Sequence, residues 1–343
     1  MLDWSSGLFP LIHEPIPTSE LFKVSPLGEE IFRTKDKITV EGSYRKSIVV
    51  KSVGGEGTGL ATHLWFSGNP SKFHQGHNVF GSDDILSLNY DLFLSICKNL
   101  SLNPSQDEIE QVKQGNYKIG RQDINYSYAL PSQADVLAWI RAAETKGSTR
   151  MGRAQNRKGS IYFGLTSEYH KQVFYSKLAE INGKRGELPK ELRNKGIEDW
   201  VQNVLRAELR LLPKELKRLN IKTAKDFVQY GVARLFHEYM GRIEMPEQIQ
   251  LNDETLLKLP NRLRSTYTLW LEGHDLRNML SEATFYRHKK ELKQHGINID
   301  LKPESTKTTN VVPLIRILEA KPAQIPDWAH EQGLIHHSAA ANY

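Results

Sequence analysis

The chain has 343 residues, of which 39% are hydrophobic and 25% are charged, a balance typical of a folded globular protein and not of a disordered one. Its single cysteine, Cys97, excludes a disulfide framework or a cysteine-based zinc site, and the sequence shows neither a secretory leader nor a long apolar run. We therefore expect a reducing, cytoplasmic setting, in which the net charge of +6 matters less than where the basic residues cluster.

The first two thirds of the chain alternate β-rich runs with glycine-bearing turns, which predicts an antiparallel sheet. Strands are expected over residues 37–41, 47–53, 62–66, 117–130 and 204–212, and a hairpin over residues 160–177. Helices are expected over residues 134–143 and 83–101, and Ser82 or Asp83 can cap the first turn of the latter.

Residues 68–81 place polar and imidazole side chains between glycines. Such a stretch suits a metal or phosphate site, and it equally suits a long turn in which glycine and asparagine adopt unusual backbone angles. His74 and His77 would point to the same side of a helix and to opposite sides of a strand. His77, between Gly76 and Asn78, is the better candidate for a ligand.

Two expected strands each carry an acid on a polar face. Asp123 shares its face with Arg121, and Glu208 shares its face with Arg210. An acid beside an arginine is most often a structural ion pair. Together with His77, however, the two acids supply oxygen and imidazole donors that suit Mg²⁺ or Mn²⁺.

Tyr175 lies in the second strand of the expected hairpin, with Lys171 and Lys177 on the same strand face. A phenol is a poor nucleophile at its ordinary pKa of about 10, but nearby lysines and a metal would favour the phenolate. The phenolate could then attack a phosphodiester and form a 5′-phosphotyrosine. The chain has 13 tyrosines, and the rivals for this role are Tyr126, Tyr162 and Tyr169.

Residues 146–158 hold five basic side chains and no acid. A flexible basic loop suits a phosphate backbone, although a solvated loop explains the same composition. The candidates for DNA contact in this loop are Arg150, Arg153, Arg157 and Lys158.

After Pro213 the pattern changes to helices, which are expected over residues 214–219, 223–240, 253–273 and 281–295. A β-rich run returns only at residues 310–318. We therefore expect an α+β domain at residues 1–215, followed by a smaller, mainly helical domain at residues 216–343.

Residues 275–296 combine a short helix with a longer basic one that Ser281 can cap. The basic face of the longer helix comprises Arg287, His288, Lys289, Lys290 and Lys293. This pattern suits the second helix of a helix-turn-helix, in which Arg287 and Lys290 would contact DNA. An ordinary solvated helix is the alternative.

Several of these segments together resemble the gene II replication initiators of filamentous bacteriophages, a family related to rolling-circle initiators. The likeness rests on residues 69–84, 121–124, 175–177, 205–210, 310–316 and 326–328. Its most specific parts are residues 75–81 and 310–314.

The resemblance implies a nuclease domain of the rolling-circle-initiator type that nicks one strand of the double-stranded replicative form at the origin and leaves a free 3′-hydroxyl. The enzyme would later cleave and recircularise the displaced single strand in the host cytoplasm, working with a host helicase and polymerase. Tyr175 would be the nucleophile with Lys177 beside it, His77, Asp123 and Glu208 would bind Mg²⁺ or Mn²⁺, and Lys72 would contact DNA.

The chain departs from wider rolling-circle enzymes in two ways. It lacks their paired histidines on one strand, and it has Ser67 or Gly68 where plasmid relatives carry a glutamate. The third metal ligand is therefore open. A non-catalytic DNA-binding regulator that keeps the fold is the second hypothesis. An RNA-binding module is disfavoured, because the paired aromatic motifs of such sheets are not evident.

Overall fold

Nine strands form one antiparallel sheet in this computed structural model, which describes residues 1–55, 59–183, 186–244, 249–250, 259–271, 274–300, 311–312 and 322–338. The spatial order is β10, β11, β12, β13, β7, β1, β6, β5, β4. Their bounds are β1 (Leu2–His13), β4 (Ile38–Glu41), β5 (Ser47–Val53), β6 (Ala61–Gly68), β7 (Lys118–Ala129), β10 (Gln155–Arg157), β11 (Ser160–Phe163), β12 (His170–Ser176) and β13 (Val204–Leu211). The predicted antiparallel α+β class is confirmed.

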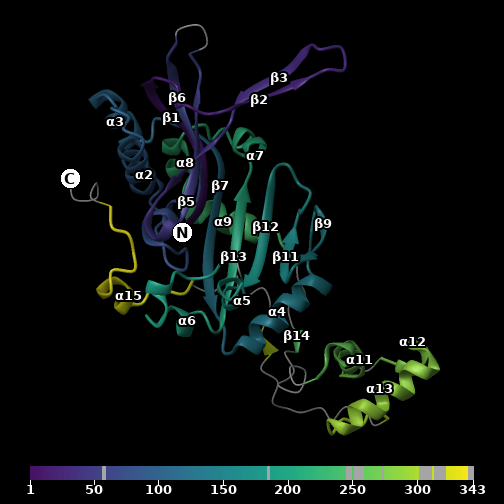
Figure 1. The fold of residues 1–343 in the computed structure, drawn as a ribbon. Helices are drawn as coiled ribbons and strands as arrows, with labels where there is room; N and C mark the ends of the chain where they lie inside the picture. Colours follow the sequence, from purple (N-terminus) through teal and green to yellow (C-terminus); the bar gives the residue numbers. More distant parts are fainter. Residues whose placement is uncertain are drawn as a thin grey trace.

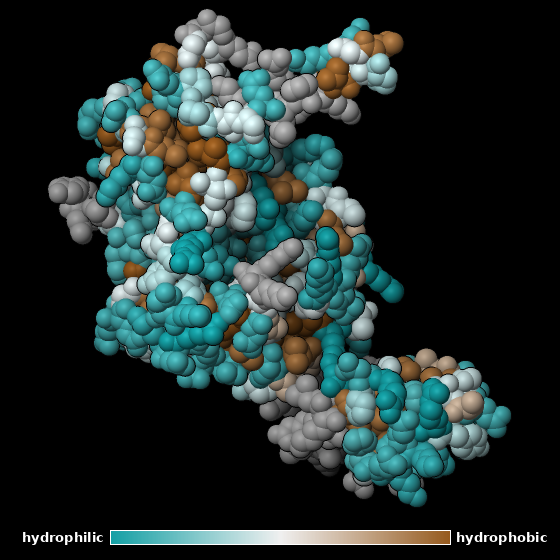
Figure 2. Space-filling view, in the orientation of Figure 1, coloured by the Kyte–Doolittle hydropathy of each residue, from teal (hydrophilic) through white to brown (hydrophobic). Residues whose placement is uncertain are grey.

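Smaller strand pairs stand beside this sheet. They are β2 (Glu20–Val24) with β3 (Glu30–Lys35), β8 (Ser148–Thr149) with β9 (Gly152–Arg153), and β14 (Ile249–Gln250) with β15 (Val311–Val312). Figure 1 shows the β2–β3 hairpin projecting from the top of the molecule. Its turn exposes 87% of Leu27, and Figure 2 shows hydrophobic residues at this tip.

Strand β1 was not predicted, yet it lies in the middle of the sheet between β7 and β6. Its sequence includes serines, a glycine and a proline, so β-propensity does not reveal it. Gly7 is required there, because a Cβ atom would lie 2.5 Å from the carbonyl oxygen of Lys118 on β7. Close packing of two backbones therefore explains this composition.

One face of the sheet carries the main hydrophobic core. Alternate residues of β13, from Leu205 to Leu211, are fully buried there, as their spacing predicted. Phe9 of β1 stacks on Phe66 of β6 with ring centroids 4.1 Å apart, and Trp139 packs on Phe174 of β12 at 5.0 Å. The opposite face of the same strands is left for polar side chains.

The expected helices form, with small shifts at their ends. They are α2 (Ile85–Asn99), α4 (Gln133–Lys146), α7 (Pro213–Arg218), α8 (Ala224–Tyr230) and α9 (Val232–Met240), whereas α3 (Gln106–Lys113) was not predicted. Asp84, and neither Ser82 nor Asp83, caps α2 by accepting from the Ser87 amide at 3.0 Å. The helix expected over residues 223–240 breaks at Gly231, whose φ is +95°. No helix in the described ranges is long and apolar enough to cross a bilayer.

Helices begin at Pro213, close to the expected boundary, but the helical cluster that is separate from the sheet begins later, at Leu259. Helices α7, α8 and α9 contribute to the main core under the sheet. A separate hydrophobic cluster spans Leu259 to Ile299 and unites α11 (Asn261–Leu271), α12 (Leu276–Met279) and α13 (Glu282–Gln294). Figure 1 shows these three helices set apart from the sheet at the lower right. The apolar sides of α8 and α9 explain the difference, because they complete the core of the sheet.

Two expected elements are described only in part. Of the helix expected over residues 253–273, the structure describes residues 259–271, which include α11. Of the β-rich run at residues 310–318 it describes only the two residues of β15. The other residues of both segments lie outside the described ranges.

Residues 322–338, which we call the C-terminal strap, return to the N-terminal part of the fold. The strap contains α15 (Asp327–Glu331) and packs with α5 (Lys177–Ile181) and α6 (Ile197–Trp200) in a second hydrophobic cluster. Its Ala329 is fully buried there, and the yellow ribbon at the lower left of Figure 1 follows this path. The strap therefore belongs with the sheet and not with α11 to α13.

Candidate active site

Three neighbouring strands bring Tyr175, Glu208 and Asp123 to one face of the sheet. In the antiparallel register Tyr175 lies opposite Arg206, and Asp123 lies opposite Arg210. Glu208 stands between those two arginines on β13. Side chains two positions apart on a strand point to the same face, so the polar faces predicted for β7 and β13 join into one surface. Because Tyr175 lies opposite Arg206, its side chain extends this polar surface onto β12.

The two acids are buried and share their arginine partners. Asp123 is 1% exposed, and its Oδ1 accepts a hydrogen bond from Nε of Arg121 at 2.8 Å. Nε of Arg210 lies 2.9 Å from Oε1 of Glu208 and 3.8 Å from Oδ2 of Asp123. The expected ion pairs within each strand therefore form, and Arg210 also links the two acids across strands.

Burial raises the pKa of Asp123 from its ordinary 3.8 to about 7, and the nearby charge of Glu208 adds to the rise. The hydrogen bond from Arg121 opposes it but does not cancel it. Arg121 and Arg210 both donate to these carboxylates, so the rise in the pKa of Asp123 reflects its burial first and the charge of Glu208 second. A cation placed beside Asp123 would favour its ionised form.

Tyr175 is half-buried, and its hydroxyl makes no hydrogen bond to any other residue in the described part of the chain. Burial raises its pKa well above the ordinary 10, and the charges of Glu208 and Glu180 raise it further. The free site therefore keeps the phenol protonated. The structure does not give it the lysine activation that the sequence suggested.

Both lysines of the predicted strand face are engaged elsewhere. Nζ of Lys171 donates to the carbonyl oxygen of Leu165 at 2.7 Å. Lys177 is fully buried, and its Nζ donates to Oδ1 of Asn78 at 2.9 Å and to Oε2 of Glu180 at 2.6 Å. Lys177 thus joins the stretch at residues 68–81 to α5, which is a positioning contact and not a contact with the phenol.

His77 is not brought to the acids, because both of its ring nitrogens are already bonded. Nε2 lies 2.8 Å from the carbonyl oxygen of Leu334 in the strap, and Nδ1 accepts from the Val79 amide at 3.2 Å. Burial lowers the pKa of His77 to about 4, so the ring is neutral and Nε2 is the donor. The described residues contain no cluster of three histidine, cysteine or acidic side chains that could hold a metal. The ligand set of His77, Asp123 and Glu208 is therefore not assembled.

The stretch at residues 68–81 acts instead as a structural joint. It opens with α1 (Pro70–Gln75), which Asn69 caps, and turns at Gly76 with φ of +82°. Oε1 of Gln75 accepts from the amide of His336 at 2.8 Å, which is a second tie to the strap. Of the two alternatives left open by the sequence, the structure supports the long turn.

Two charged groups of the site were missed by sequence reasoning. The first is Asp3, whose Oδ1 accepts a hydrogen bond from the side-chain amide of Asn78 at 2.7 Å. Asp3 was missed because the strand that carries it, β1, was not predicted. The second is Glu180, whose charge raises the pKa of Tyr175. The sequence could have indicated Glu180, because it lies only five residues after Tyr175.

Arg206 is fully buried on the same face of β13 as Glu208. It donates to the carbonyl oxygens of Asn78 at 3.1 Å and Val79 at 2.9 Å. This guanidinium therefore fixes the joint against the strand that carries Glu208.

Comparisons with known proteins decide the family. Residues 1–230 match the N-terminal family of the phage replication-associated protein, the gene II product, and residues 251–335 match the corresponding C-terminal family. The chain belongs to this family of phage replication-associated proteins. It is 40% identical to the replication-associated protein of Enterobacteria phage I2-2 over 328 residues, which are 95% of each chain. It is 23% identical to the proteins of the same name from phages fd and M13, over 77% of this chain and 76% of theirs. The resemblance to gene II proteins of filamentous phages is thereby confirmed.

In this replication-associated protein the candidate DNA contacts lie mostly on exposed surface. The exposed side chains are Arg150, Arg153, Arg157, Lys158, Arg287 and Lys290. Residues 148–157 are not a plain flexible loop, because they form β8, β9 and the edge strand β10. Lys72 is half-buried, and its Nζ lies 3.5 Å from Oε1 of Glu180.

The basic face of α13 is narrower than the sequence suggested. His288 is buried, with Nδ1 2.7 Å from the Thr266 hydroxyl, and Lys289 pairs with Asp300. Helix α12 has only four residues. Arg287 and Lys290 remain available to solvent on α13.

Titration of His77 gives a test of the joint. Because its folded-state pKa of about 4 lies below the ordinary 6.5, the unfolded chain binds the proton more readily. The stability that neutral His77 supports is thus complete above pH 6.5 and is lost as the pH falls toward 4. Glutamine does not titrate, so His77→Gln should lose less stability than the wild type over this window, by at most about 3 kcal/mol. Urea unfolding at a series of pH values measures the difference.

His295→Gln is the matched control, since His295 is exposed at the end of α13. Its stability curve should run parallel to that of the wild type. A parallel curve for His77→Gln would contradict the burial of a neutral ring at residue 77.

Proposed function

We propose that this chain initiates rolling-circle replication of a phage genome as a nicking and joining enzyme, with Tyr175 as the nucleophile. Family membership supports the role in replication, because the relatives are named replication-associated proteins. The observation that carries the chemistry is the unpaired hydroxyl of Tyr175 on the same sheet face as the buried acids Asp123 and Glu208.

The reaction is a transesterification. The Tyr175 oxygen attacks the phosphorus of a phosphodiester, the bond from phosphorus to the 3′ oxygen breaks, and that oxygen leaves as a 3′-hydroxyl after taking up a proton. Glu208, whose charge acts on the phenol, is the candidate acceptor of the phenol proton. Because one phosphoester replaces another, a 3′-hydroxyl can attack the phosphotyrosine in reverse. Strand joining therefore needs no external energy source.

Cations border the site and would hold the DNA backbone. Lys171 lies opposite Arg210 in the sheet, and Arg210 and Arg121 both lie beside Asp123. Burial lowers the pKa of Lys171, and the charges of these arginines lower it further. Aromatic rings stand beside two of them: the Arg121 guanidinium lies 5.3 Å from the Trp4 ring centroid, and that of Arg210 lies 5.8 Å from the Tyr162 ring centroid. Cations with interleaved aromatic rings are typical of surfaces that bind single strands.

Asp123 and Glu208 fit a divalent ion, although His77 does not. Mg²⁺ is usually held by one or two carboxylates together with water and substrate phosphate. Arg210 contacts both carboxylates, so the two acids are close enough to share one ion, which would take the place of an arginine partner. When bound, Mg²⁺ or Mn²⁺ would polarise the scissile phosphate and stabilise its developing charge.

The remaining surfaces suit the rest of the cycle. The exposed basic residues of α13 and of the β8–β10 region would bind double-stranded origin DNA, while the sheet face would hold the displaced single strand. A host helicase and polymerase would unwind and extend the nicked strand. A non-catalytic DNA-binding regulator remains the second candidate, because the exposed basic surfaces alone would serve it.

Nicking should depend on Tyr175. Incubation of the protein with supercoiled replicative-form DNA and Mg²⁺ should give nicked circles and a covalent protein–DNA adduct. Tyr175→Phe should form no adduct, because phenylalanine lacks the attacking oxygen, and nicking should fall by at least about a thousandfold, the order expected when a nucleophile is removed. Gel analysis of circles and labelled adduct measures both.

Tyr162→Phe is the matched control, because Tyr162 lies on the same sheet face two strands away from Glu208. It should still form the adduct. An adduct that survives Tyr175→Phe would move the nucleophile elsewhere, and bound but uncut DNA with the wild type would favour the regulator.

The two acids should be needed for cutting and not for binding. Asp123→Asn and Glu208→Gln should each slow nicking by about a hundredfold or more, as expected for a lost charge contact to a catalytic metal. Glu168→Gln, at an exposed acid, should not. Removing divalent ions with EDTA should stop nicking by the wild type and leave DNA binding intact. The proposed metal role would be excluded if both variants kept full nicking activity, or if the wild type still nicked DNA in EDTA.

Arg287 and Lys290 should matter for duplex binding. The double variant Arg287→Ala, Lys290→Ala should bind origin duplex more weakly, by about tenfold at low salt, with a salt dependence reduced by about two phosphate contacts. Cleavage of a single-stranded substrate should be unchanged, because these residues lie on the separate helical cluster. Equal duplex affinity of the variant and the wild type, measured by fluorescence anisotropy, would leave α13 without a role in DNA binding.

A further inference from the structure

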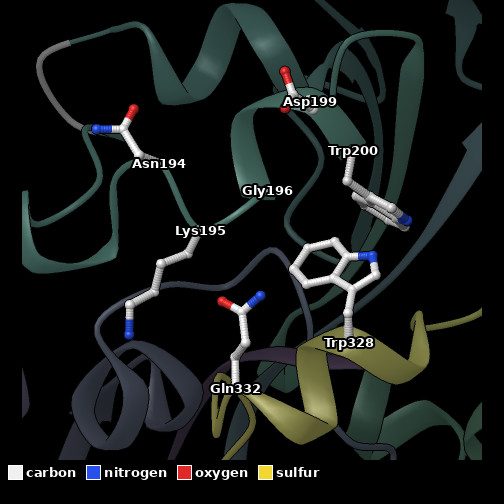
Figure 3. A pocket seen from close by; sticks show the side chains of 7 residues that line it. All are labelled: Asn194, Lys195, Gly196, Asp199, Trp200, Trp328 and Gln332. Carbon is white, nitrogen blue, oxygen red and sulfur yellow. The ribbon is translucent and has the colours of Figure 1, made fainter.

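Two hollows have Trp200 in their lining. The first has a volume of about 550 Å³ and is lined by Asn194, Lys195, Asp199, Trp200, Trp328 and Gln332, among others (Figure 3). The second has a volume of about 450 Å³, and its lining includes Met1, Phe80, Ser127, Trp200 and Ile325. Either volume is ample for a planar aromatic ring system, and Trp200 forms a wall of both.

The walls of the first hollow are aromatic and their edges are polar. Figure 3 shows the indoles of Trp200 and Trp328 together at one end, with Gln332 beside them and Lys195 across the hollow. Both indoles pack edge-on against Phe80, at centroid distances of 5.0 Å and 5.7 Å, which holds the pair in place. Neither indole N–H donates to another residue in the described part of the chain.

Gly196 brings the backbone close to the second indole. Its φ is +83°, and a Cβ atom at this position would lie 3.3 Å from the Trp328 ring. Two segments far apart in sequence, at Gly196 and Trp328, therefore pack closely in the lining of the hollow. Side-chain amides such as those of Asn194 and Gln332 both donate and accept hydrogen bonds, as the edges of unpaired bases do.

The hollows begin close to the proposed nucleophile. Tyr175, Arg206 and Ser127 are paired in a row across β12, β13 and β7. Adjacent strands lie about 4.8 Å apart, which puts the backbone of Ser127 roughly 10 Å from that of Tyr175. Ser127 lines the second hollow, and Trp200 lines both. Stacked nucleotides rise about 3.4 Å each, so a cleaved strand reaches this place within a few nucleotides.

We propose that the hollows lined by Trp200 hold unpaired bases of the strand that Tyr175 cleaves, stacked on Trp200 and Trp328. This inference rests on the proposed function for the identity of the strand. Base stacking on aromatic rings tolerates any sequence, and Lys195 supplies a contact for phosphate. The strap, which contributes Trp328 and Gln332, thereby becomes part of the DNA-binding surface.

The test separates base contacts from backbone contacts. Binding of the full chain to an oligothymidylate of about 20 nucleotides is compared with binding to an abasic strand of the same length, which has the same charge and no bases. Fluorescence anisotropy at one fixed salt concentration gives both affinities. The wild type should prefer the oligothymidylate, and Trp328→Leu should reduce that preference by about tenfold. Tyr169→Leu is the matched control, since Tyr169 is 47% exposed and directly precedes the strand that carries Tyr175. Its preference should be unchanged.

Trp328 also packs on the second hydrophobic cluster, so thermal melting must show that the variant is folded. Lys195→Gln, outside that cluster, is the second variant. It should weaken binding of both polymers equally and lower the slope of log affinity against log salt concentration by the equivalent of about one phosphate contact. A folded Trp328→Leu with wild-type preference, or unchanged affinity of Lys195→Gln for both polymers, would overturn the proposal. The measurement needs no cleavage, so its outcome and that of the Tyr175→Phe nicking test are read separately.

Discussion

The register of β12, β13 and β7 is the constraint on which the site depends. Side chains alternate between the faces of a sheet, so a slip of one residue in β13 would turn Glu208 into the core and Leu209 toward the polar face. The buried leucines of β13 and Phe174 of β12 resist such a slip through the apolar area that they remove from water. The hydrophobic face thus fixes the polar face, and with it the approach of Tyr175 to the acids.

Buried charge forms the second level of organisation. Arg206, Lys177 and the acids lie in or beside the sheet with almost no exposure, and each has hydrogen-bond partners. Removing one member of such a network leaves another buried charge unpaired, which is costly. The network ties the joint at residues 68–81 to the strands and, through His77, to the strap. A local change in this joint is therefore expected to act on the whole lower end of the sheet.

Periodicity revealed the parts of the site that lie within strands. The faces of Asp123 and Glu208, the hairpin that carries Tyr175 and the arginine beside each acid followed from a spacing of two residues. The same reasoning failed for β1, because close packing against a neighbouring backbone, and not strand propensity, explains its serines and glycine. It also failed for His77, because the residues around a histidine do not show whether its ring binds a metal or donates to a distant carbonyl group.

By itself the sequence determined the antiparallel class, the polar strand faces and the family, because these depend on local spacing and on ordered motifs. Tertiary structure alone decided that the Leu334 carbonyl group occupies Nε2 of His77, that Lys177 pairs with Glu180, and that the charges of carboxylates raise the pKa of Tyr175. It also decided that Trp200 and Trp328, far apart in the chain, line one hollow. Contacts of this kind join distant segments, and burial then sets their protonation. The spacing of neighbouring residues predicts neither long-range contacts nor burial.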